Sequence, residues 1–163
     1  MKESVLEFGS NIGNKIENIK KAIHSINCLP NTKVTKISRF YETEPFGVPD
    51  KQDNYINCCA QVFTTLSPFT LLGACLGIES SMGRVRLFKN QARIIDIDLL
   101  LYEDFSLNSS ELTVPHPRIL ERSFVMVPLS DIYKNKIALN LNFKDSLYKI
   151  GTDGVKLIHS PLQ

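Results

Sequence analysis

The chain has 163 residues, 43% of them apolar and 22% charged, a composition ordinary for one globular domain with a real core. Its formal net charge of +2 is too small to indicate a nucleic-acid-binding protein by itself. The longest apolar stretch, Leu71 to Ile78, is far shorter than the ~18 residues of a membrane span. Glu7 interrupts the N-terminal segment where a signal peptide needs an apolar run. We expect a single domain over residues 1–163.

The first half of the chain alternates strand and helix patterns. The pattern of residues 3–8 predicts a strand, and a turn over 9–14 leads to a helix that ends near Pro30. One stripe of this helix is apolar and holds Ile16, Ile19, Ile23 and Ile26. We predict a second strand over 32–41, a turn-rich loop over 44–53 and a third strand over 55–65.

The predicted third strand has one apolar face and one half-polar face. The apolar face holds Ile56, Cys58, Ala60 and Val62, and the other holds Tyr55, Asn57, Cys59 and Gln61. A half-polar face inside a sheet needs hydrogen-bond partners, and a bound heterocycle is one possible source.

The second half begins with Ser67 and Pro68, an N-cap and a first-turn proline, and this helix should end near Gly83. An apolar strand then runs to about Tyr102, a polar turn covers 104–110 and a short helix covers 123–132, while the tail beyond is weakly patterned. The order strand-helix-strand-strand-helix-strand predicts an α+β fold, a ferredoxin-like antiparallel sheet with helices packed on it (an α/β/α sandwich).

The four cysteines form no C-x-x-C pair, and Cys58 and Cys59 are neighbours in a strand-like run. This spacing argues against disulfides and zinc. We interpret the cysteines as small buried apolar residues of a protein in the reducing cytoplasm.

Two acids lie within the apolar strand of the second half. Asp96 and Asp98 alternate with branched residues, so both carboxylates project from the same face. Two such acids repel each other unless a cation lies between them. Mg²⁺ prefers oxygen ligands of this kind and also binds substrate phosphates. The pattern indicates a metal-polyphosphate site.

Four cations precede these acids with no acid among them: Arg84, Arg86, Lys89 and Arg93. Arginines are suited to hold the remaining phosphate charge. The alternative from the residues alone is a solvent-facing ion network between the same arginines and acids, and it stays open at this point. No G-x-x-x-x-G-K-[ST] loop and no protein-kinase motif set is present.

An ordered set of motifs runs from residue 5 to about residue 132. It comprises Phe8-Gly9-Ser10-Asn11, Tyr41-Glu42-Thr43-Glu44-Pro45-Phe46-Gly47, Tyr55-Ile56-Asn57, Glu79, Gly83-Arg84-Val85-Arg86, Arg93 to Leu100, Leu112 to Arg118, and Arg122-Ser123-Phe124. This set resembles the 6-hydroxymethyl-7,8-dihydropterin pyrophosphokinases. These folate-biosynthesis enzymes transfer pyrophosphate from ATP to a pterin alcohol and release AMP.

The resemblance implies a role for each matching residue. Asp96 and Asp98 correspond to the ligands of two Mg²⁺ ions, and together with Arg84 and Arg93 they form the catalytic set. The ATP-binding residues it implies are Glu79, Arg84, Arg86, Arg93, Thr113, His116 and Arg122. The pterin-binding residues it implies are Thr43, Phe46, Tyr55, Asn57 and Phe124. The substrates it implies are ATP and the pterin, with no nucleic acid and no membrane, and we expect a cytoplasmic monomer.

One segment departs from the family pattern. Lys89-Asn90-Gln91-Ala92-Arg93 stands where the family commonly has Arg-Trp-Gly-Pro-Arg, and the chain has no tryptophan. Because lids exclude water and complete such sites, we hypothesise a lower turnover than that of a Trp-bearing homologue. Two other interpretations are a ferredoxin-like nucleic-acid-binding module and a family member that binds its ligands without turnover.

Overall fold

One antiparallel sheet organises the fold in the computed structural model, which describes residues 1–45, 51–85 and 91–159. Its strands are β1 (Lys2–Ser10), β2 (Thr32–Ile37), β3 (Phe40–Thr43), β4 (Tyr55–Thr64), β5 (Asp96–Tyr102) and β10 (Lys156–His159). The strand order is β10-β3-β4-β1-β5, and β2 also pairs with β4. Strand β1 is therefore central, with β4 on one side and β5 on the other.

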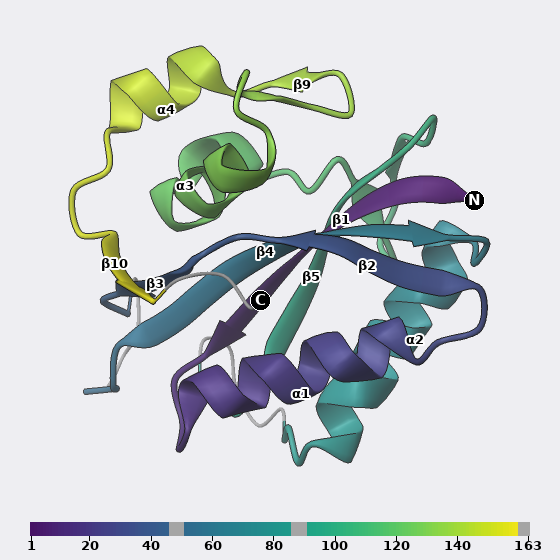
Figure 1. Ribbon diagram of the computed structural model, residues 1–163, viewed down its shortest axis with the longest axis horizontal. Coiled ribbons are helices and arrows are strands. Elements are labelled where there is room, and N and C mark those ends of the chain that lie inside the picture. Colours follow the sequence, from purple (N-terminus) through teal and green to yellow (C-terminus); the bar gives the residue numbers. More distant parts are fainter. Residues whose placement is uncertain (46–50, 86–90, 160–163) are drawn as a thin grey trace.

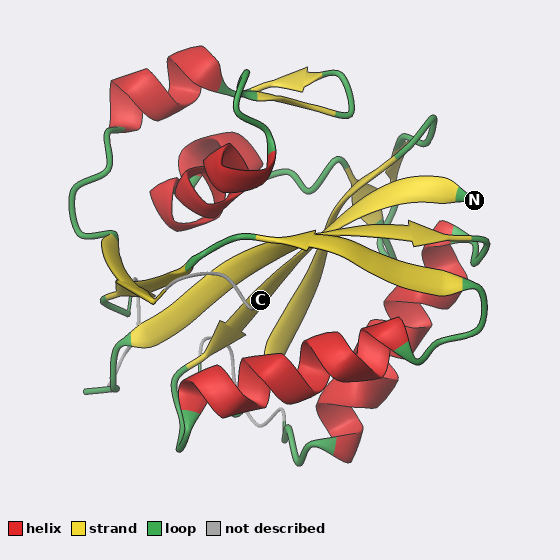
Figure 2. Cartoon of the chain, in the orientation of Figure 1, coloured by secondary structure: helices red, strands yellow, loops and turns green. Residues whose placement is uncertain are grey.

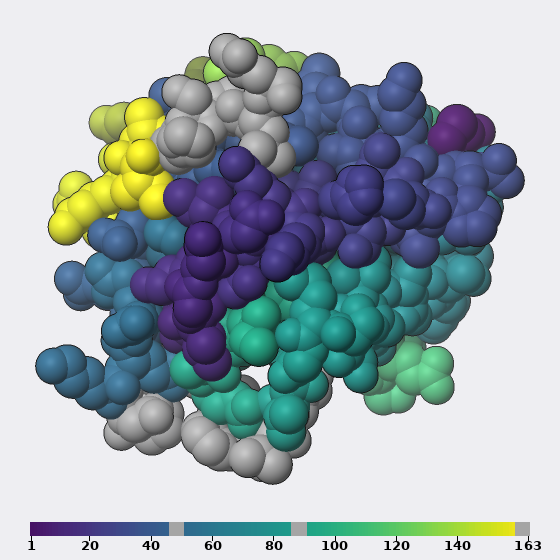
Figure 3. All heavy atoms as spheres, turned by 60° about the horizontal axis from the view of Figure 1, so that its bottom comes forward, coloured from purple at the N-terminus to yellow at the C-terminus, as the bar shows by residue number. Residues whose placement is uncertain are grey.

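Helices cover both faces of this sheet, as Figures 1 and 2 show. Helices α1 (Lys15–Asn27) and α2 (Pro68–Ser81) pack on one face, and Figure 3 shows them side by side on that surface. Helices α3 (Ser123–Ile132) and α4 (Lys144–Ile150) lie on the opposite side. The predicted α/β/α sandwich is confirmed.

The short elements connect these layers. They are β6 (Leu107–Asn108) paired with β7 (Thr113–Val114), β8 (Ile137–Ala138) paired with β9 (Leu141–Asn142), and the 3₁₀ turn η1 (Ile119–Glu121). The weakly patterned tail thus supplies a hairpin, α4 and the edge strand β10. Among the described residues, no helix is long and apolar enough to span a membrane.

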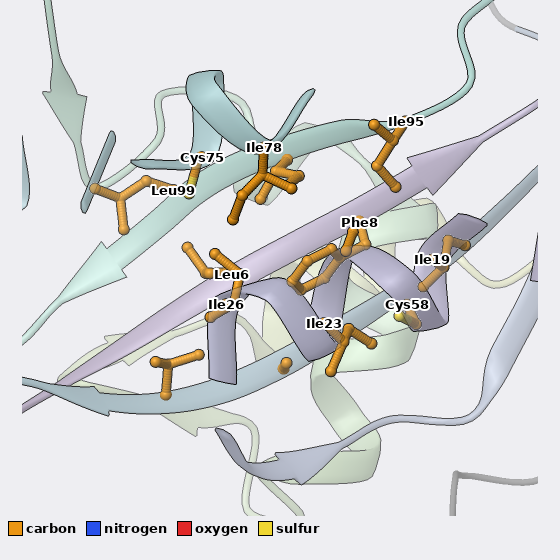
Figure 4. Packing of buried hydrophobic residues seen from close by; sticks show 14 of the residues in the cluster. Leu6, Phe8, Ile19, Ile23, Ile26, Cys58, Cys75, Ile78, Ile95 and Leu99 are labelled. Atoms are coloured by element: carbon orange, nitrogen blue, oxygen red, sulfur yellow. The ribbon is translucent and has the colours of Figure 1, made fainter. Parts of the chain in front are cut away.

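The main core lies between the sheet and the first two helices (Figure 4). Leu6 and Phe8 of β1 pack there against Ile19, Ile23 and Ile26 of α1, the predicted stripe. Asn14 and Ser67 cap α1 and α2 by accepting hydrogen bonds from the backbone N–H of Glu17 and Thr70, which satisfies amides that a helix start leaves unpaired.

A second core lies between the other sheet face and α3. It includes Val5, Cys59, Leu100, Leu101 and Met126. A register shift between Val5 and Leu6 in the β1–β5 pairing lets the consecutive residues Leu100 and Leu101 both reach this core, because a bulge locally breaks the alternation of faces.

The prediction of one strand over 32–41 is wrong, because the strand conformation is interrupted between the end of β2 and the start of β3. The Ser38 hydroxyl accepts a hydrogen bond from the Cys59 amide at 2.9 Å, in place of a backbone carbonyl. Next to it, the Arg39 amide donates to Asp131 Oδ2 of α3 at 3.0 Å. The side chains of Ser38 and Asp131 thus accept hydrogen bonds from backbone amides that would donate to backbone carbonyls in a continuous strand.

Candidate active site

Three neighbouring strands place polar side chains on the face that carries α3. Asp96 and Asp98 project from that face, as predicted, while Ile97 packs into the core on the other face. On β1, Glu7 pairs with Asp98, and Gly9 pairs with Asp96. Gly9 also pairs with Asn57 of β4. Directly opposed residues share a face, so acids, glycine and amide form one surface.

Two arginines bracket Asp96. Nη1 of Arg84 contacts Asp96 Oδ1 and lies 2.5 Å from Oε1 of Glu79, and Nη2 of Arg93 lies 2.9 Å from Asp96 Oδ2. The Glu79 side chain is only 2% exposed and also accepts a hydrogen bond from the Ile97 amide at 2.7 Å. Glu79, predicted on the nucleotide side, therefore holds Arg84 against β5.

Asp98 has weaker partners. Its Oδ2 lies 3.7 Å from Arg122 Nη1 and 4.0 Å from His116 Nε2. Removal from water, together with the charge of Asp96, raises the pKa of Asp98 to about 6 despite the cation Arg122. Burial, with the nearby Arg122, lowers the pKa of His116 to about 4, so its ring is neutral at pH 7. The Asp98–His116 contact is consequently not an ion pair at that pH.

Asn11, at the end of β1, fixes the backbone of Arg93. The Asn11 side-chain oxygen accepts a hydrogen bond from the Arg93 backbone N–H at 2.7 Å. The Asn11 backbone N–H donates to the Arg93 carbonyl at 3.1 Å. Its Nδ2 donates to Gln52 Oε1 and to the carbonyl of Asp53. Sequence analysis assigned Asn11 no role beyond its place in a motif, because hydrogen bonds to residues this distant leave no local pattern.

Four of the five predicted pterin residues, all but Phe46, are described by the structure and lie beside this cluster. The Arg93 guanidinium lies 5.4 Å from the centre of the Tyr55 ring, and that of Arg122 lies 5.5 Å from the centre of the Phe124 ring, distances typical of cation–π contacts. Asn57 Nδ2 donates to Thr43 Oγ1 at 2.8 Å. Part of the half-polar face of β4 thus finds its partners within the protein.

Two predicted site residues, Arg86 and Phe46, lie outside the described residues, as do Lys89 and Asn90 of the segment that departs from the family pattern. Thr113 bonds locally, to Asn108 Oδ1 at 3.2 Å and to the Ser109 carbonyl at 3.3 Å.

A further carboxyl, that of Glu7, escaped the sequence analysis. The residue is 4% exposed, and its Oε1 has no hydrogen-bond partner among the described residues. Burial, with the charges of Asp98 and Asp96, raises its pKa well above the ordinary value. An acid at an inward position of the strand Val5-Leu6-Glu7-Phe8 was the available signal.

The donor set suits a divalent cation with further ligands from a substrate. Within residues 1–45, 51–85 and 91–159, no group of three or more His, Cys, Asp or Glu side chains is arranged to hold a metal ion. Mg²⁺ commonly binds through only one or two carboxylates plus phosphate oxygens. The pair Asp96 and Asp98, with the raised pKa of Asp98, fits that kind of site, because added positive charge would relieve their repulsion.

Comparison with known proteins gives consistent matches. A family model described as 7,8-dihydro-6-hydroxymethylpterin-pyrophosphokinase (HPPK) matches residues 5–134. The 2-amino-4-hydroxy-6-hydroxymethyldihydropteridine pyrophosphokinase of Methylorubrum extorquens is 35% identical over 158 residues, which cover 97% of this chain and 99% of that protein. Its counterpart in Haemophilus influenzae is 36% identical over 144 residues, covering 88% and 89%.

Other matches are longer proteins. The folic acid synthesis protein fol1 of Schizosaccharomyces pombe is 36% identical over 98% of this chain, which spans only 22% of fol1. A crystal structure of Plasmodium falciparum HPPK-DHPS superposes with a TM-score of 0.71 at 16% identity, over 99% of this chain and 51% of that one. The chain thus spans about a fifth of fol1 and about half of the solved chain, but 99% of the Methylorubrum protein and 89% of the Haemophilus protein.

Proposed function

Because this chain belongs to the 7,8-dihydro-6-hydroxymethylpterin-pyrophosphokinase family, we propose that it transfers the pyrophosphoryl group of ATP to the hydroxymethyl group of 6-hydroxymethyl-7,8-dihydropterin. The products are AMP and the pterin diphosphate, an intermediate of folate biosynthesis. The observation that carries the proposal is the contact of Arg84 and Arg93 with Asp96, beside Tyr55 and Asn57.

The phosphate side of the site consists of Arg84, Arg93 and Arg122, with His116 next to them. The Nε of Arg93 is buried and has no hydrogen-bond partner among the described residues. An unmet guanidinium donor suits a phosphate oxygen, which accepts charge-assisted bonds. We assign Arg84 and Arg93 as the groups that stabilise charge developing on the transferred phosphates, and Arg86 and Thr113 as further nucleotide contacts.

Asp96 and Asp98 would hold two Mg²⁺ ions together with the ATP phosphates. When bound, such ions neutralise phosphate charge and polarise the transferred group. In the structure Arg84 and Arg93 contact the two carboxylate oxygens of Asp96. Both arginines would therefore exchange part of this contact for phosphate oxygens when ATP binds.

The pterin would lie between the rings of Tyr55 and Phe124, with Asn57 and the backbone at Thr43 and Phe46 reading its polar edge. Stacking on aromatic faces and a few placed polar groups are common means of holding a flat heterocycle. The hydroxymethyl oxygen then attacks the β-phosphorus in line. A new oxygen–phosphorus bond forms, and the bond from the β-phosphorus to the oxygen that bridges the α- and β-phosphates breaks. AMP leaves with that oxygen, and the hydroxyl proton is released to water.

The test is product analysis with purified protein, Mg²⁺, ATP and the pterin, beside an Asp96→Asn control. We expect AMP only when the pterin is present, and loss of AMP formation in the control. A folded preparation that binds both ligands and yields no AMP would instead favour the binding-only interpretation. Turnover measured beside a Trp-bearing homologue tests the hypothesis that the Trp-less segment lowers the rate.

We further propose that the protein acts as a monomer in the cytoplasm. The proposal of a reducing compartment is supported by the free thiols of Cys58, Cys59 and Cys75, all of them buried. Size-exclusion chromatography with light scattering tests the monomer.

A further inference from the structure

Resting on the proposed function, we propose that Glu7 is a specificity-determining residue for the pterin. Its buried carboxyl oxygen accepts a hydrogen bond from the N–H edge of the heterocycle. Four observations carry this inference: the position of Glu7 in the sheet, its unpaired oxygen, the side chains that converge on that oxygen, and the partners that other acids of the same layer have.

Glu7 lies in the centre of the sheet, at the junction of the two substrate regions. It pairs with Cys59 on β4 and with Asp98 on β5. Gly9, two residues further along β1 and on the same face, pairs with Asn57. The side chain of Glu7 therefore lies between the acids assigned to the metal and the amide assigned to the pterin.

Three side chains converge above Gly9. A Cβ built on Gly9 would lie 3.2 Å from Asn57 Oδ1, 3.6 Å from Glu7 Oε1 and 3.8 Å from Tyr55 Cδ1. Because Asn57 Nδ2 donates to Thr43 Oγ1, the amide turns its acceptor oxygen toward this space. Two acceptor oxygens beside an aromatic ring match a flat ligand that carries N–H donors.

The pterin has such donors on one edge, the ring N3–H and the exocyclic 2-amino group. A carboxyl oxygen accepts a hydrogen bond whether the group is protonated or ionised. The absence of a side chain at Gly9 leaves the approach to both acceptors clear. Glu7 and Asn57 would read the two donors side by side.

A purely structural role would give Glu7 partners within the protein. Glu3 lies on the same strand, and its Oε1 accepts from Gln61 Nε2 at 2.7 Å and from the Tyr133 hydroxyl at 2.5 Å. Glu79 bonds Arg84 and the Ile97 amide. Glu7 Oε1 has no such partner among the described residues, and an unsatisfied buried oxygen destabilises a fold.

The experiment measures equilibrium binding of 6-hydroxymethyl-7,8-dihydropterin in the presence of Mg²⁺ and a non-hydrolysable ATP analogue. The proteins are the wild type, Glu7→Met, which keeps the side-chain length and removes the acceptor, and Glu7→Gln, which keeps an acceptor oxygen. Glu3→Gln is the matched control, since it alters an acid of the same strand face away from the site. Glu7→Leu serves as a second acceptor-free variant if Glu7→Met does not fold.

We expect Glu7→Met to bind the pterin about 10- to 100-fold more weakly, the loss typical of one hydrogen bond to a buried partner. Glu7→Gln should retain affinity within about threefold, and Glu3→Gln should match the wild type. Binding of the nucleotide analogue by these three variants should equal that of the wild type. The thermal midpoint of Glu7→Met should equal or exceed that of the wild type, because the orphaned oxygen is gone.

A second ligand tests the edge that is read. In 6-hydroxymethyl-7,8-dihydrolumazine a carbonyl replaces the 2-amino group, so the edge that carries N3–H loses the amino donor and presents an acceptor in its place. The wild type should prefer the pterin, and Glu7→Met should lose most of that preference. A wild type that binds both heterocycles equally, or a folded Glu7→Met protein with wild-type pterin affinity, overturns the role of Glu7 and leaves the proposed function intact. A wild type that does not bind the pterin at all overturns the proposed function as well.

Discussion

Replacing Asp98 by asparagine should stabilise the ligand-free protein while abolishing transfer. The raised pKa of Asp98 means that its ionised carboxylate destabilises the folded state, because the group is removed from water and lies next to the charge of Asp96. Asparagine keeps the size of the side chain and removes the charge. The same charge is the one proposed to hold Mg²⁺, so stability and activity should change in opposite directions.

The magnitude follows from the pKa. A pKa of about 6, against an ordinary value of 3.8, corresponds to about 3 kcal/mol at neutral pH. The Asp98 side chain keeps 32% of its surface exposed, and water screens part of this penalty. We therefore expect a gain of about 1–3 kcal/mol in unfolding free energy for Asp98→Asn. In a chain of this size that corresponds to roughly 2–10 °C in thermal midpoint.

The sign of the pH dependence is fixed by the direction of the shift. The pKa of Asp98 lies above its unfolded value, so the penalty is complete above pH 6 and disappears as the pH falls toward 3.8. The advantage of Asp98→Asn should be full at pH 8 and small at pH 4. His116 also titrates in this range, but it does so in both proteins, and comparison at equal pH largely removes its effect.

Urea unfolding at pH 8, 6 and 4, without nucleotide or divalent cations, measures this difference. Asp131→Asn is the matched control. Although burial raises the pKa of Asp131, hydrogen bonds from Arg39 and Tyr41 lower it overall, so asparagine there should destabilise the protein at pH 8. The reasoning is refuted if Asp98→Asn is no more stable than the wild type at pH 8, or if its advantage persists unchanged at pH 4.

Three further predictions concern single side chains. Gly9→Ala places a Cβ 3.2 Å from Asn57 Oδ1, tighter than ordinary contact, and should weaken pterin binding about tenfold with an intact fold; unchanged affinity in a titration would contradict this. Arg84→Lys keeps the charge but loses the planar fork that contacts Asp96, and steady-state AMP formation should show kcat falling about 10²-fold with little change in pterin KM. Because burial lowers the pKa of His116 to about 4, the wild type should lose about 2 kcal/mol more unfolding free energy than His116→Gln between pH 7 and pH 5. Equal losses in urea titrations would argue against a buried neutral ring.

Local pattern predicted the long helices and strands up to residue 132, except the strand over 32–41. The helix over 123–132 was predicted with the bounds that α3 has, and the capping pair Ser67 and Pro68 marks the start of α2. The family and the reaction class inferred from the ordered motifs are confirmed. The nucleic-acid-binding alternative has no support from these comparisons. Caps and periodicity depend on residues a few positions apart, which is why sequence reveals them.

The strand predicted over 32–41 failed for the opposite reason. Its break depends on the pairing of Ser38 with Cys59 and of Arg39 with Asp131, partners far away along the chain. The tail was likewise unpredicted, since a four-residue edge strand such as β10 gains its place only by pairing with β3.

By itself, the sequence determined which residues share a face and which chemistry they bring. Because alternation of side chains along a strand is a property of the backbone, the sequence alone predicts that Asp96 and Asp98 lie on the same face. Only the tertiary structure decided which strands are neighbours. It placed β1 between β4 and β5, and so brought Glu7 and Gly9 between Asn57 and Asp98. Strand order and register are set by how the faces pack against α1, α2 and α3, and that depends on the whole chain at once.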